Sequence, residues 1–312
     1  MDNYRNSFPL TVKRKGMFMN KTDSPEKKIL YISFILIQSL VYGIGNPLTK
    51  VAYHSISPLW LLAARFSLAF LLFALLWGKR LLAAARQVSW TLWMPSALCC
   101  AGAYISCNLA LDLTAATNVG FIMSLPVLFA PILFSLVFHR PYSYKRLPLQ
   151  LVTILGLFLL CCNTGTFSFG PGEALALLDA LCLAGVLVFG EKAMAQMDVL
   201  SVTGLQIGVT MVLSLAGALL FDDVSVLPSV ELEAWLVVLY LAAVCTIAAY
   251  LLQNKAVAHL NASTVSMLQC TQPILTALVA YFLLGETLNG LGLAGAVLIV
   301  LCLLADGRYS SL

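Results

Sequence analysis

Arg65 and Asp179 are two charged residues that lie well inside stretches of sequence that are otherwise apolar. Burying an arginine in hydrocarbon costs from ~2.5 to more than ~10 kcal/mol, so Arg65 must have a polar partner or face a water-filled cavity. It is therefore either a binding group for an anion or one half of a structural pair. Asp179 could pair with Arg65 or bind and release a proton, because desolvation favours a neutral acid. A shallow position in contact with water is the alternative.

Uncharged polar side chains recur at helical spacing in the same kind of stretch. Tyr104 and Asn108 are four residues apart and share one helix face, and Tyr250 and Asn254 repeat that spacing. Residues 269–272 form the most polar interior run of the second half of the chain and directly precede a proline. Such groups either form hydrogen bonds between helices, worth about 0.6–2 kcal/mol each in membranes, or line a cavity. The spacing leaves both interpretations open.

The stretches that must position these residues have the composition of membrane helices. The chain has 312 residues, of which 61% are hydrophobic and 10% charged, whereas soluble domains carry about 25% charged residues. An apolar run of about 20 residues can cross a bilayer. Ten such runs are predicted, at 30–49, 57–78, 90–111, 116–138, 148–164, 173–190, 200–221, 234–253, 261–284 and 289–305. The expected fold class is all-α integral membrane.

Residues 1–29 are expected to be a retained cytoplasmic tail, with Met17 or Met19 as alternative starts. The tail is polar and basic, and the apolar run after it is too long for the core of a signal peptide. The net charge of +4 is then an orientation signal rather than a nucleic-acid site. With the N-terminus inside, 16 of the 18 Lys and Arg residues fall in inner segments. Both termini are therefore expected in the cytoplasm.

The chain contains one pattern twice. Residues 108–139 and 254–286 each contain a helix end, a polar turn with an Ala-x-Thr sequence, and a second helix with an internal proline. Adding 147 to the residue number carries Pro126 to Pro273 and His139 to Glu286. Two repeats of five helices each are therefore expected, at 30–165 and 172–306.

An odd number of helices per repeat predicts that the second repeat crosses the membrane in the opposite sense. Inverted repeats with broken helices are the architecture of alternating-access carriers. Pro47, Pro126 and Pro273 are expected to break helices at the gates, because proline removes a helical hydrogen bond. Lys50 and Glu286 are candidate charged groups at the outer rim; a simple helix-end role is the alternative for both.

The sequence does not indicate an enzyme or a metal protein. It holds no H-E-x-x-H, G-x-S-x-G or phosphate-binding loop motif, and its three histidines fall at the ends of the predicted spans. Nine cysteines occur without C-x-x-C spacing. No cofactor, metal or catalytic residue is predicted. A channel, receptor or accessory membrane subunit is the alternative class of protein.

Together these features resemble the EamA-type transporters of the drug/metabolite transporter superfamily, which have ten helices in two EamA repeats. The resemblance covers about residues 30–305. It rests on residues 43–50, Pro58, Arg65, the turns at 115–117 and 262–264, Pro126, Gly172, Pro273, Glu286 and Gly295. The chain departs from the family pattern at His139, where a glutamate is usual, and at Asp179, where a small residue is expected.

The resemblance implies a bacterial inner-membrane permease that exports amino acids or related metabolites by secondary or facilitated transport. Carriers of drugs, amines, carboxylates or vitamins are alternatives. The expected partners are a small-molecule substrate, the lipid bilayer and a proton or counter-substrate. Arg65 would attract a carboxylate, while amides and tyrosines would fix its orientation. The substrate is expected near the midplane among Asn46, Arg65, Tyr104, Asn108, Asp179, Tyr250, Asn254, Gln269 and Gln272.

Overall fold

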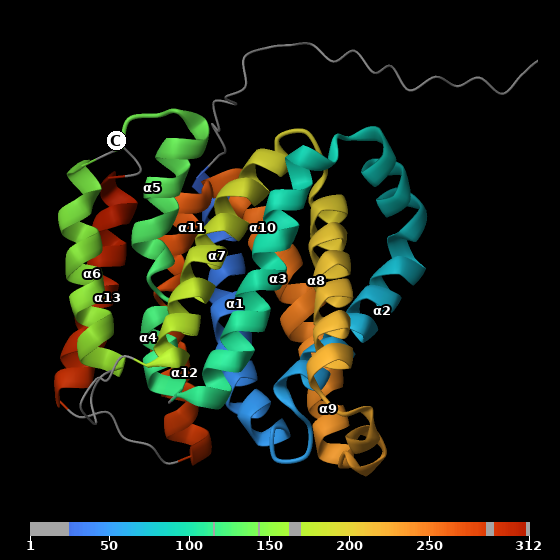
Figure 1. The fold of residues 1–312 in the computed structure, drawn as a ribbon. Coiled ribbons are helices and arrows are strands. Elements are labelled where there is room, and N and C mark those ends of the chain that lie inside the picture. Colours follow the sequence, from blue (N-terminus) through green and yellow to red (C-terminus); the bar gives the residue numbers. More distant parts are fainter. Residues whose placement is uncertain (1–24, 115, 143, 162–169, 285–289, 310–312) are drawn as a thin grey trace, which may run out of the picture.

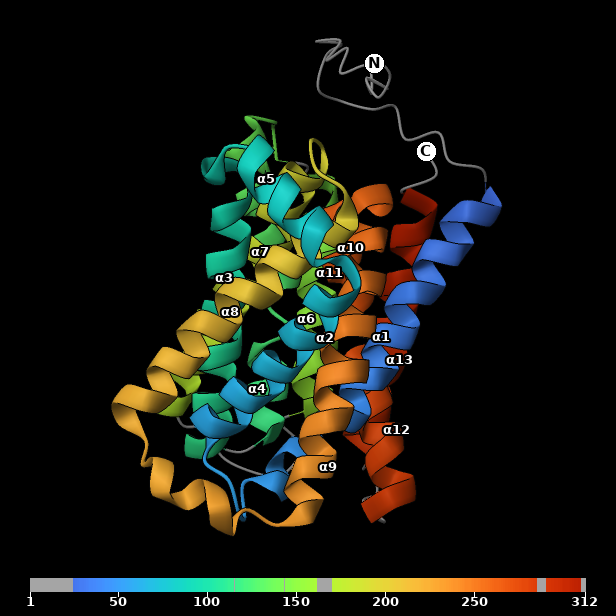
Figure 2. The ribbon, with the colours of Figure 1, turned by 90° about the vertical axis from the view of Figure 1, so that its right-hand side faces the viewer.

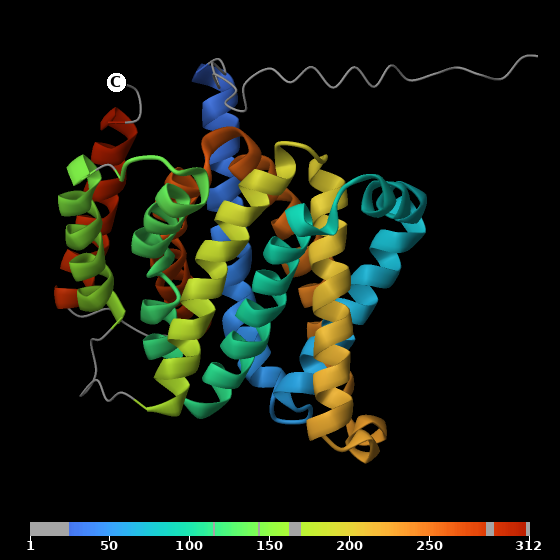
Figure 3. The same ribbon diagram turned by 45° about the horizontal axis from the view of Figure 1, so that its top comes forward.

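The computed structural model describes residues 25–114, 116–142, 144–161, 170–284 and 290–309, and every regular element in these residues is helical. The helices stand side by side as one bundle (Figure 1 and Figure 3). The first half holds α1 (Pro25–Ala52), α2 (Pro58–Gln87), α3 (Trp90–Leu113), α4 (Ala116–Ile122), α5 (Pro126–Phe138), η1 (Tyr144–Arg146) and α6 (Leu147–Cys161). The second half holds α7 (Pro171–Met194), α8 (Val199–Phe221), η2 (Val224–Ser229), α9 (Leu232–Tyr240), η3 (Leu241–Ala248), α10 (Ala249–Leu260), α11 (Ala262–Gln269), α12 (Gln272–Leu284) and α13 (Gly290–Tyr309).

Seven helical segments of the described residues are long and apolar enough to cross a membrane. They are Glu26–Ala52, Pro58–Gln87, Trp90–Leu113, Val119–Phe138, Pro171–Met194, Val199–Phe221 and Leu232–Leu260. The predicted spans 148–164 and 289–305 correspond to shorter apolar helices, and the span 261–284 is divided into α11 and α12. The all-helical membrane fold is therefore confirmed, whereas ten crossings stay a prediction.

The two ends of the bundle carry opposite charge. The α2–α3, α5–α6, α7–α8 and α10–α11 connections lie at one end, together with the start of α1 and the end of α13 (Figure 1 and Figure 2). This basic end carries Lys79, Arg80, Arg86, Arg140 and Lys192. The opposite, acidic end carries Asp112, Glu173, Asp222, Asp223, Glu231 and Glu233, beside Lys50.

Several helices begin at a residue that satisfies free backbone N–H groups. The Ser57 hydroxyl accepts a hydrogen bond from the Trp60 N–H, and Pro58 opens α2. Asp198 caps α8 at the basic end and pairs with Arg80 at 3.2 Å. Partial burial raises the pKa of Asp198, but hydrogen bonds from Ser201 and the nearby Arg80 outweigh this effect and hold it below its ordinary value.

The two helices with repeated prolines are broken, as the sequence predicts. Pro126 is the first residue of α5, which follows α4 after a three-residue gap. Pro273 is the second residue of α12, which follows α11 after a two-residue gap. The break predicted at Pro47 is wrong, because α1 runs without interruption through that residue. A proline inside a membrane helix is tolerated where surrounding groups satisfy the backbone that it frees.

The helices of the two halves pack in matching pairs. The second helices of the halves, α2 and α8, pack against each other, as do the fifth helices, α6 and α13. The two broken helices also contact each other, through α5 of the first and α11 of the second. The α3–α7 contact has its counterpart in the contact between α1 and α10. This exchange of equivalent partners is what a two-fold relation between the halves requires.

Glycines allow α6 and α13 to approach closely. A Cβ added at Gly295 would lie 2.4 Å from the Gly156 carbonyl oxygen and 2.7 Å from the Leu160 nitrogen. Both are backbone atoms that cannot rotate away, so any larger residue must separate the helices. Small residues at such contacts are the usual means of helix association in membranes, where packing rather than the hydrophobic effect holds helices together.

We therefore expect Gly295→Ala to destabilise the protein by about 1–3 kcal/mol, the usual effect of overpacking. Thermal unfolding in detergent should show a lower midpoint. Gly217→Ala is the matched control, because nothing lies within 4 Å of its Cβ position in α8. Equal midpoints for the two variants would contradict the close α6–α13 contact.

Candidate functional site

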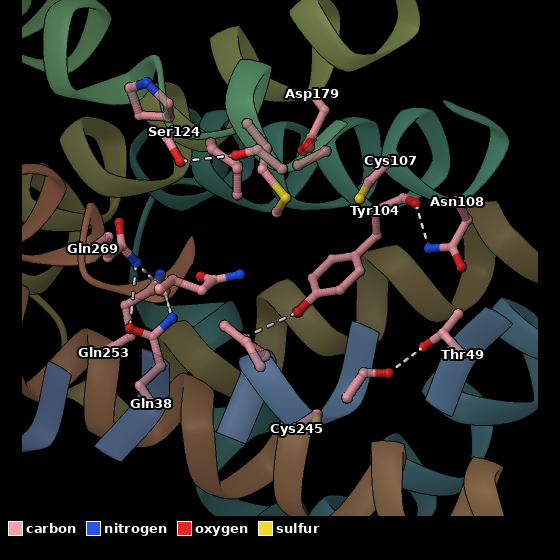
Figure 4. Close-up of a pocket in the computed structure, with 18 of the residues that line it drawn as sticks. Gln38, Thr49, Tyr104, Cys107, Asn108, Ser124, Asp179, Cys245, Gln253 and Gln269 are labelled. Carbon is pink, nitrogen blue, oxygen red and sulfur yellow. Dashed lines mark hydrogen bonds between the residues drawn. The ribbon is translucent and has the colours of Figure 1, made fainter. Parts of the chain in front are cut away.

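A cavity lies at the centre of the bundle and receives side chains from both halves. The volume of the cavity that is accessible to water is about 100 Å³, several times what one water molecule needs. The polar residues on its wall are Gln38, Tyr42, Thr49, Arg65, Tyr104, Cys107, Asn108, Ser124, Asp179, Cys245, Tyr250, Gln253, Ser266, Gln269 and Gln272. Figure 4 shows many of them converging on one space.

Arg65 enters the cavity from α2 and is only 5% exposed. Its Nε donates to Thr246 Oγ1 at 2.7 Å, and one terminal nitrogen donates weakly to the Tyr104 hydroxyl and the Cys245 carbonyl at 3.4 and 3.5 Å. Within the described ranges no carboxylate lies at salt-bridge distance from Arg65. The pairing with Asp179 that the sequence allowed is therefore not formed, and the guanidinium keeps unused donors beside the cavity.

Two of the three acceptors for Arg65 come from a π-helical segment, η3, within the long helix that spans residues 232–260. The wider turn lets Thr246 donate its hydroxyl to the Leu241 carbonyl five residues back at 2.9 Å while it accepts from Arg65. π-Helical turns are rare in proteins, and those that occur often lie at functional sites. Here the turn presents a hydroxyl and a carbonyl to a buried cation.

Tyr104 contacts the guanidinium, and two further tyrosines contact Tyr104. The Tyr104 ring centroid lies 4.8 Å from the guanidinium carbon of Arg65, which is cation–π distance. The Tyr104 and Tyr42 hydroxyls are 3.2 Å apart, and the Tyr104 and Tyr250 rings lie 5.8 Å apart. These contacts bring together three residues of the predicted site, Arg65, Tyr104 and Tyr250, and add Tyr42.

Three glutamine side-chain amides form a cluster on the wall of the cavity. Gln269 Nε2 donates to Gln253 Oε1 at 3.0 Å and to Gln38 Oε1 at 3.3 Å, and Gln38 Nε2 donates to Gln253 Oε1 at 3.1 Å. The cluster joins α1, α10 and α11 (Figure 4). Gln272 also lines the cavity, beside the α11–α12 break. Amides can rotate to donate or accept, so this wall suits a polar ligand.

Asp179 reaches the cavity from α7 and is 1% exposed. The Cys107 thiol lies close to its carboxyl group, while Oδ2 has no hydrogen-bond partner among the described residues. The shallow, wetted position considered from the sequence is thus wrong, because the carboxyl is buried among α3 and α7 side chains. An unpartnered buried oxygen beside a cavity is a feature that needs explanation.

The two asparagines have different surroundings. Asn108 lines the cavity, where its Oδ1 accepts from the Tyr53 hydroxyl at 2.7 Å. Asn254 lies outside the cavity lining; its Nδ2 donates to Thr203 at 2.8 Å and to Gln206 at 2.7 Å. The structure therefore separates Asn254 from the other predicted binding residues and places it in a network between helices.

The remaining predicted residues are placed in part. Pro126 and Pro273 both line the cavity at the helix breaks. Lys50 lies in the last turn of α1 at the acidic end, outside the lining. The Asn46 and Pro47 side chains and the whole of Glu286 lie outside the described part of the chain.

An apolar cluster lies between the cavity and the basic end. Its buried members are Ile35, Ala130, Ala184, Leu187, Val188, Ala256, Val257, Ala262 and Val265. On each of their helices these residues are nearer to the basic end than the cavity-lining residues are. Toward the acidic end, by contrast, the lining reaches Thr49 and Leu111, within one turn of the ends of α1 and α3.

A family model described as the EamA-like transporter family matches residues 29–162 and, a second time, residues 170–305. The chain belongs to the EamA-like transporter family. A solved structure titled "Crystal structure of protein" is similar, with a TM-score of 0.75 and 19% identity over 92% of this chain and 99% of that chain. That likeness shows the fold alone. No curated protein matches the chain.

Membership of the EamA-like family makes the protein a multi-pass membrane transporter of the drug/metabolite transporter superfamily. Each EamA repeat contributes to the cavity. The first supplies Arg65 and Tyr104, and the second supplies Asp179, Tyr250 and Gln269. The cavity therefore lies between the two EamA repeats.

Sequence reasoning missed several residues that line the cavity. Gln38, Tyr42 and Gln253 stand at positions that an amphipathic pattern would have marked, since each lies on the helix face that also bears a predicted site residue or a packing glycine. Cys245 and its neighbour Thr246 carried no such signal. Their role depends on the π-helical turn, which no local sequence motif announces.

We expect Asn254→Ala to lower stability rather than substrate binding. The change leaves the Gln206 and Thr203 oxygens without a donor in a buried site, which costs about 1–3 kcal/mol. Thermal unfolding should show the loss, while transport per folded molecule stays near that of the wild type. Ser229→Ala, at an exposed hydroxyl in η2, is the control for stability. A transport defect at unchanged stability would return Asn254 to the binding site.

Proposed function

We propose that the protein is a secondary transporter that moves a small carboxylate-bearing metabolite, an amino acid or a related compound, across the cytoplasmic membrane by alternating access. The observation that carries the proposal is the buried Arg65 guanidinium with no carboxylate partner among the described residues. Removing one partner of a buried ion pair is strongly destabilising, so a lone buried cation favours binding an anion. A carboxylate also matches the planar fork of a guanidinium.

The surroundings of Arg65 support a small polar cargo rather than a large apolar one. Tyrosine hydroxyls and glutamine amides on the wall of the same cavity offer hydrogen bonds to a ligand. Aromatic rings and the apolar residues between them provide contact area for a short side chain. Carriers of other small carboxylates are the nearest alternative, because they would use the same cation.

The packing supports ten helices arranged as two inverted repeats. The second helix of the first repeat, α2, begins at the acidic end, whereas its counterpart α8 begins at the basic end (Figure 1). Each of the broken helices α4–α5 and α11–α12 resumes with a proline among its first two residues, and both prolines line the cavity. Inverted repeats that meet at a central site are typical of secondary transporters.

The distribution of charge supports an orientation with the basic end in the cytoplasm. Both termini would then be cytoplasmic, and the apolar cluster that includes Ile35, Leu187 and Val257 would close the cavity from the cytoplasm. The α5, α7 and α11 helices meet in that cluster. Separating them while the acidic end closes would move the cargo from one side to the other, and export is the direction that we propose.

We expect Arg65→Ala to reduce substrate affinity at least thirtyfold, since losing one partner of a buried charge pair costs ~2–5 kcal/mol. The measurement is counterflow in proteoliposomes loaded with an unlabelled mixture of L-amino acids and presented with the same mixture in labelled form. Arg65→Lys should be intermediate, because an ammonium keeps the charge but not the bidentate geometry.

The exposed Arg86, on the same helix, provides the matched control, and Arg86→Ala should exchange label as the wild type does. Wild-type counterflow also distinguishes a carrier from a channel, because a channel shows no stimulation by substrate on the opposite side. Normal counterflow in Arg65→Ala, or its absence in the wild type, would refute this function.

A further inference from the structure

Asp179 and Arg65 are the two charged residues on the described cavity wall. They belong to different EamA repeats and do not touch each other. Asp179 is the ninth residue of α7 and Arg65 the eighth of α2, and both helices begin at the acidic end. At a rise of 1.5 Å per residue, both side chains start about 10–12 Å from that end. The cavity thus holds a carboxyl group, Asp179, and a guanidinium group, Arg65, at about the same depth in the bundle.

Few titratable groups face Asp179 from the helices around it. On α3 the Cys107 thiol contacts its carboxyl group, and on α7 Cys182 lies one turn further along. Neither α8 nor the described parts of α4, α5 and α11 carry a titratable side chain. On α10, Tyr250 lines the cavity, whereas Lys255 is exposed and His259 stacks on Tyr31.

The other charged groups of α7 and its neighbours lie at the helix ends. Glu173 bonds to Thr114 at the acidic end, where Asp112 is exposed. Glu191 and Lys192 stand at the basic end, and Asp198 is paired with Arg80 there. No cation of the described residues therefore neutralises Asp179, and its Oδ2 accepts no hydrogen bond from them.

An isolated carboxylate is far more costly to bury than a neutral acid, so an empty site of this kind holds a proton. A ligand with a cationic N–H group supplies what the protein lacks, namely a charge and a hydrogen-bond donor for Oδ2. We propose that Asp179 alternately holds a proton and the ammonium group of the cargo, so that the transporter exchanges one proton for each substrate molecule. This rests on the proposed function, in which Arg65 holds the carboxylate of the same molecule.

The exchange is balanced in charge and atoms. As the substrate's ammonium group approaches, the O–H bond of Asp179 breaks and its proton passes to water in the cavity. The carboxylate then accepts an N–H···O bond from the ammonium group. When the substrate leaves on the other side, a proton from water returns to the carboxyl group. A substrate with a carboxylate but no amine would bind Arg65 without releasing this proton.

Proteoliposomes separate this proposal from the proposed function. Vesicles without internal amino acids receive the labelled L-amino-acid mixture outside, with the lumen about one pH unit more acidic than the outside. One-for-one exchange predicts up to about tenfold accumulation of label in the wild type. Counterflow at equal pH on both sides reports substrate exchange without net proton movement.

Asp179→Asn should retain reduced counterflow through Arg65 but show no accumulation driven by the pH gradient. Asp179→Glu should keep both activities. Asp112→Asn, the same substitution at an exposed acid of α3, should behave as the wild type. Gradient-driven accumulation by Asp179→Asn overturns the proposal and leaves the proposed function intact. A wild type that shows counterflow but no gradient-driven accumulation has the same consequence.

Absence of counterflow in the wild type would instead refute the proposed function itself. If Asp179→Asn does not yield folded protein, the wild type decides with a pH dye enclosed in the lumen. Uptake of label must then be accompanied by loss of lumenal protons, at about one proton per molecule. Uptake without proton loss overturns the proposal.

Discussion

The Arg65 guanidinium lies inside the membrane-spanning bundle, and the structure around it depends on stabilising this buried positive charge. A π-helical turn supplies the Thr246 hydroxyl and the Cys245 carbonyl, and Tyr104 supplies its ring. These neutral partners satisfy part of the guanidinium but provide no opposite charge. The cation therefore keeps donors that the anionic ligand we propose could accept.

The two EamA repeats contribute unlike groups to a site that their pairing makes nearly symmetrical. Their prolines meet the cavity at equivalent places, and α2 and α8 pack as partners. The first repeat nevertheless places a base on the wall and the second an acid, Asp179. Such asymmetry would give the proposed cargo one orientation. The carboxylate of a zwitterion would contact the first repeat and its ammonium group the second. A relative movement of the repeats would therefore change the contacts of the bound molecule.

Much of this could be predicted from the sequence. The repeated prolines predicted the broken helices, and the intramembrane charges predicted which residues reach the cavity, because burying them elsewhere is too costly. Helical spacing could not separate Asn254 from Tyr250, because four residues amount to only slightly more than one turn. The partners that hold Asn254, Thr203 and Gln206, come from α8, which is distant in the sequence. The prediction of a helix break at Pro47 is wrong, because α1 continues as a helix through that residue.

The central claim is that the guanidinium of Arg65 binds the carboxylate of the cargo. Solid-state NMR on the reconstituted protein can test it, with the arginines labelled with nitrogen-15 and the L-amino-acid mixture labelled with carbon-13 at the carboxyl carbon. We predict a dipolar coupling that reports hydrogen-bonding distance between guanidinium nitrogen and carboxyl carbon and that is lost in Arg65→Lys. Amino acids that bind and exchange without that coupling would contradict the claim.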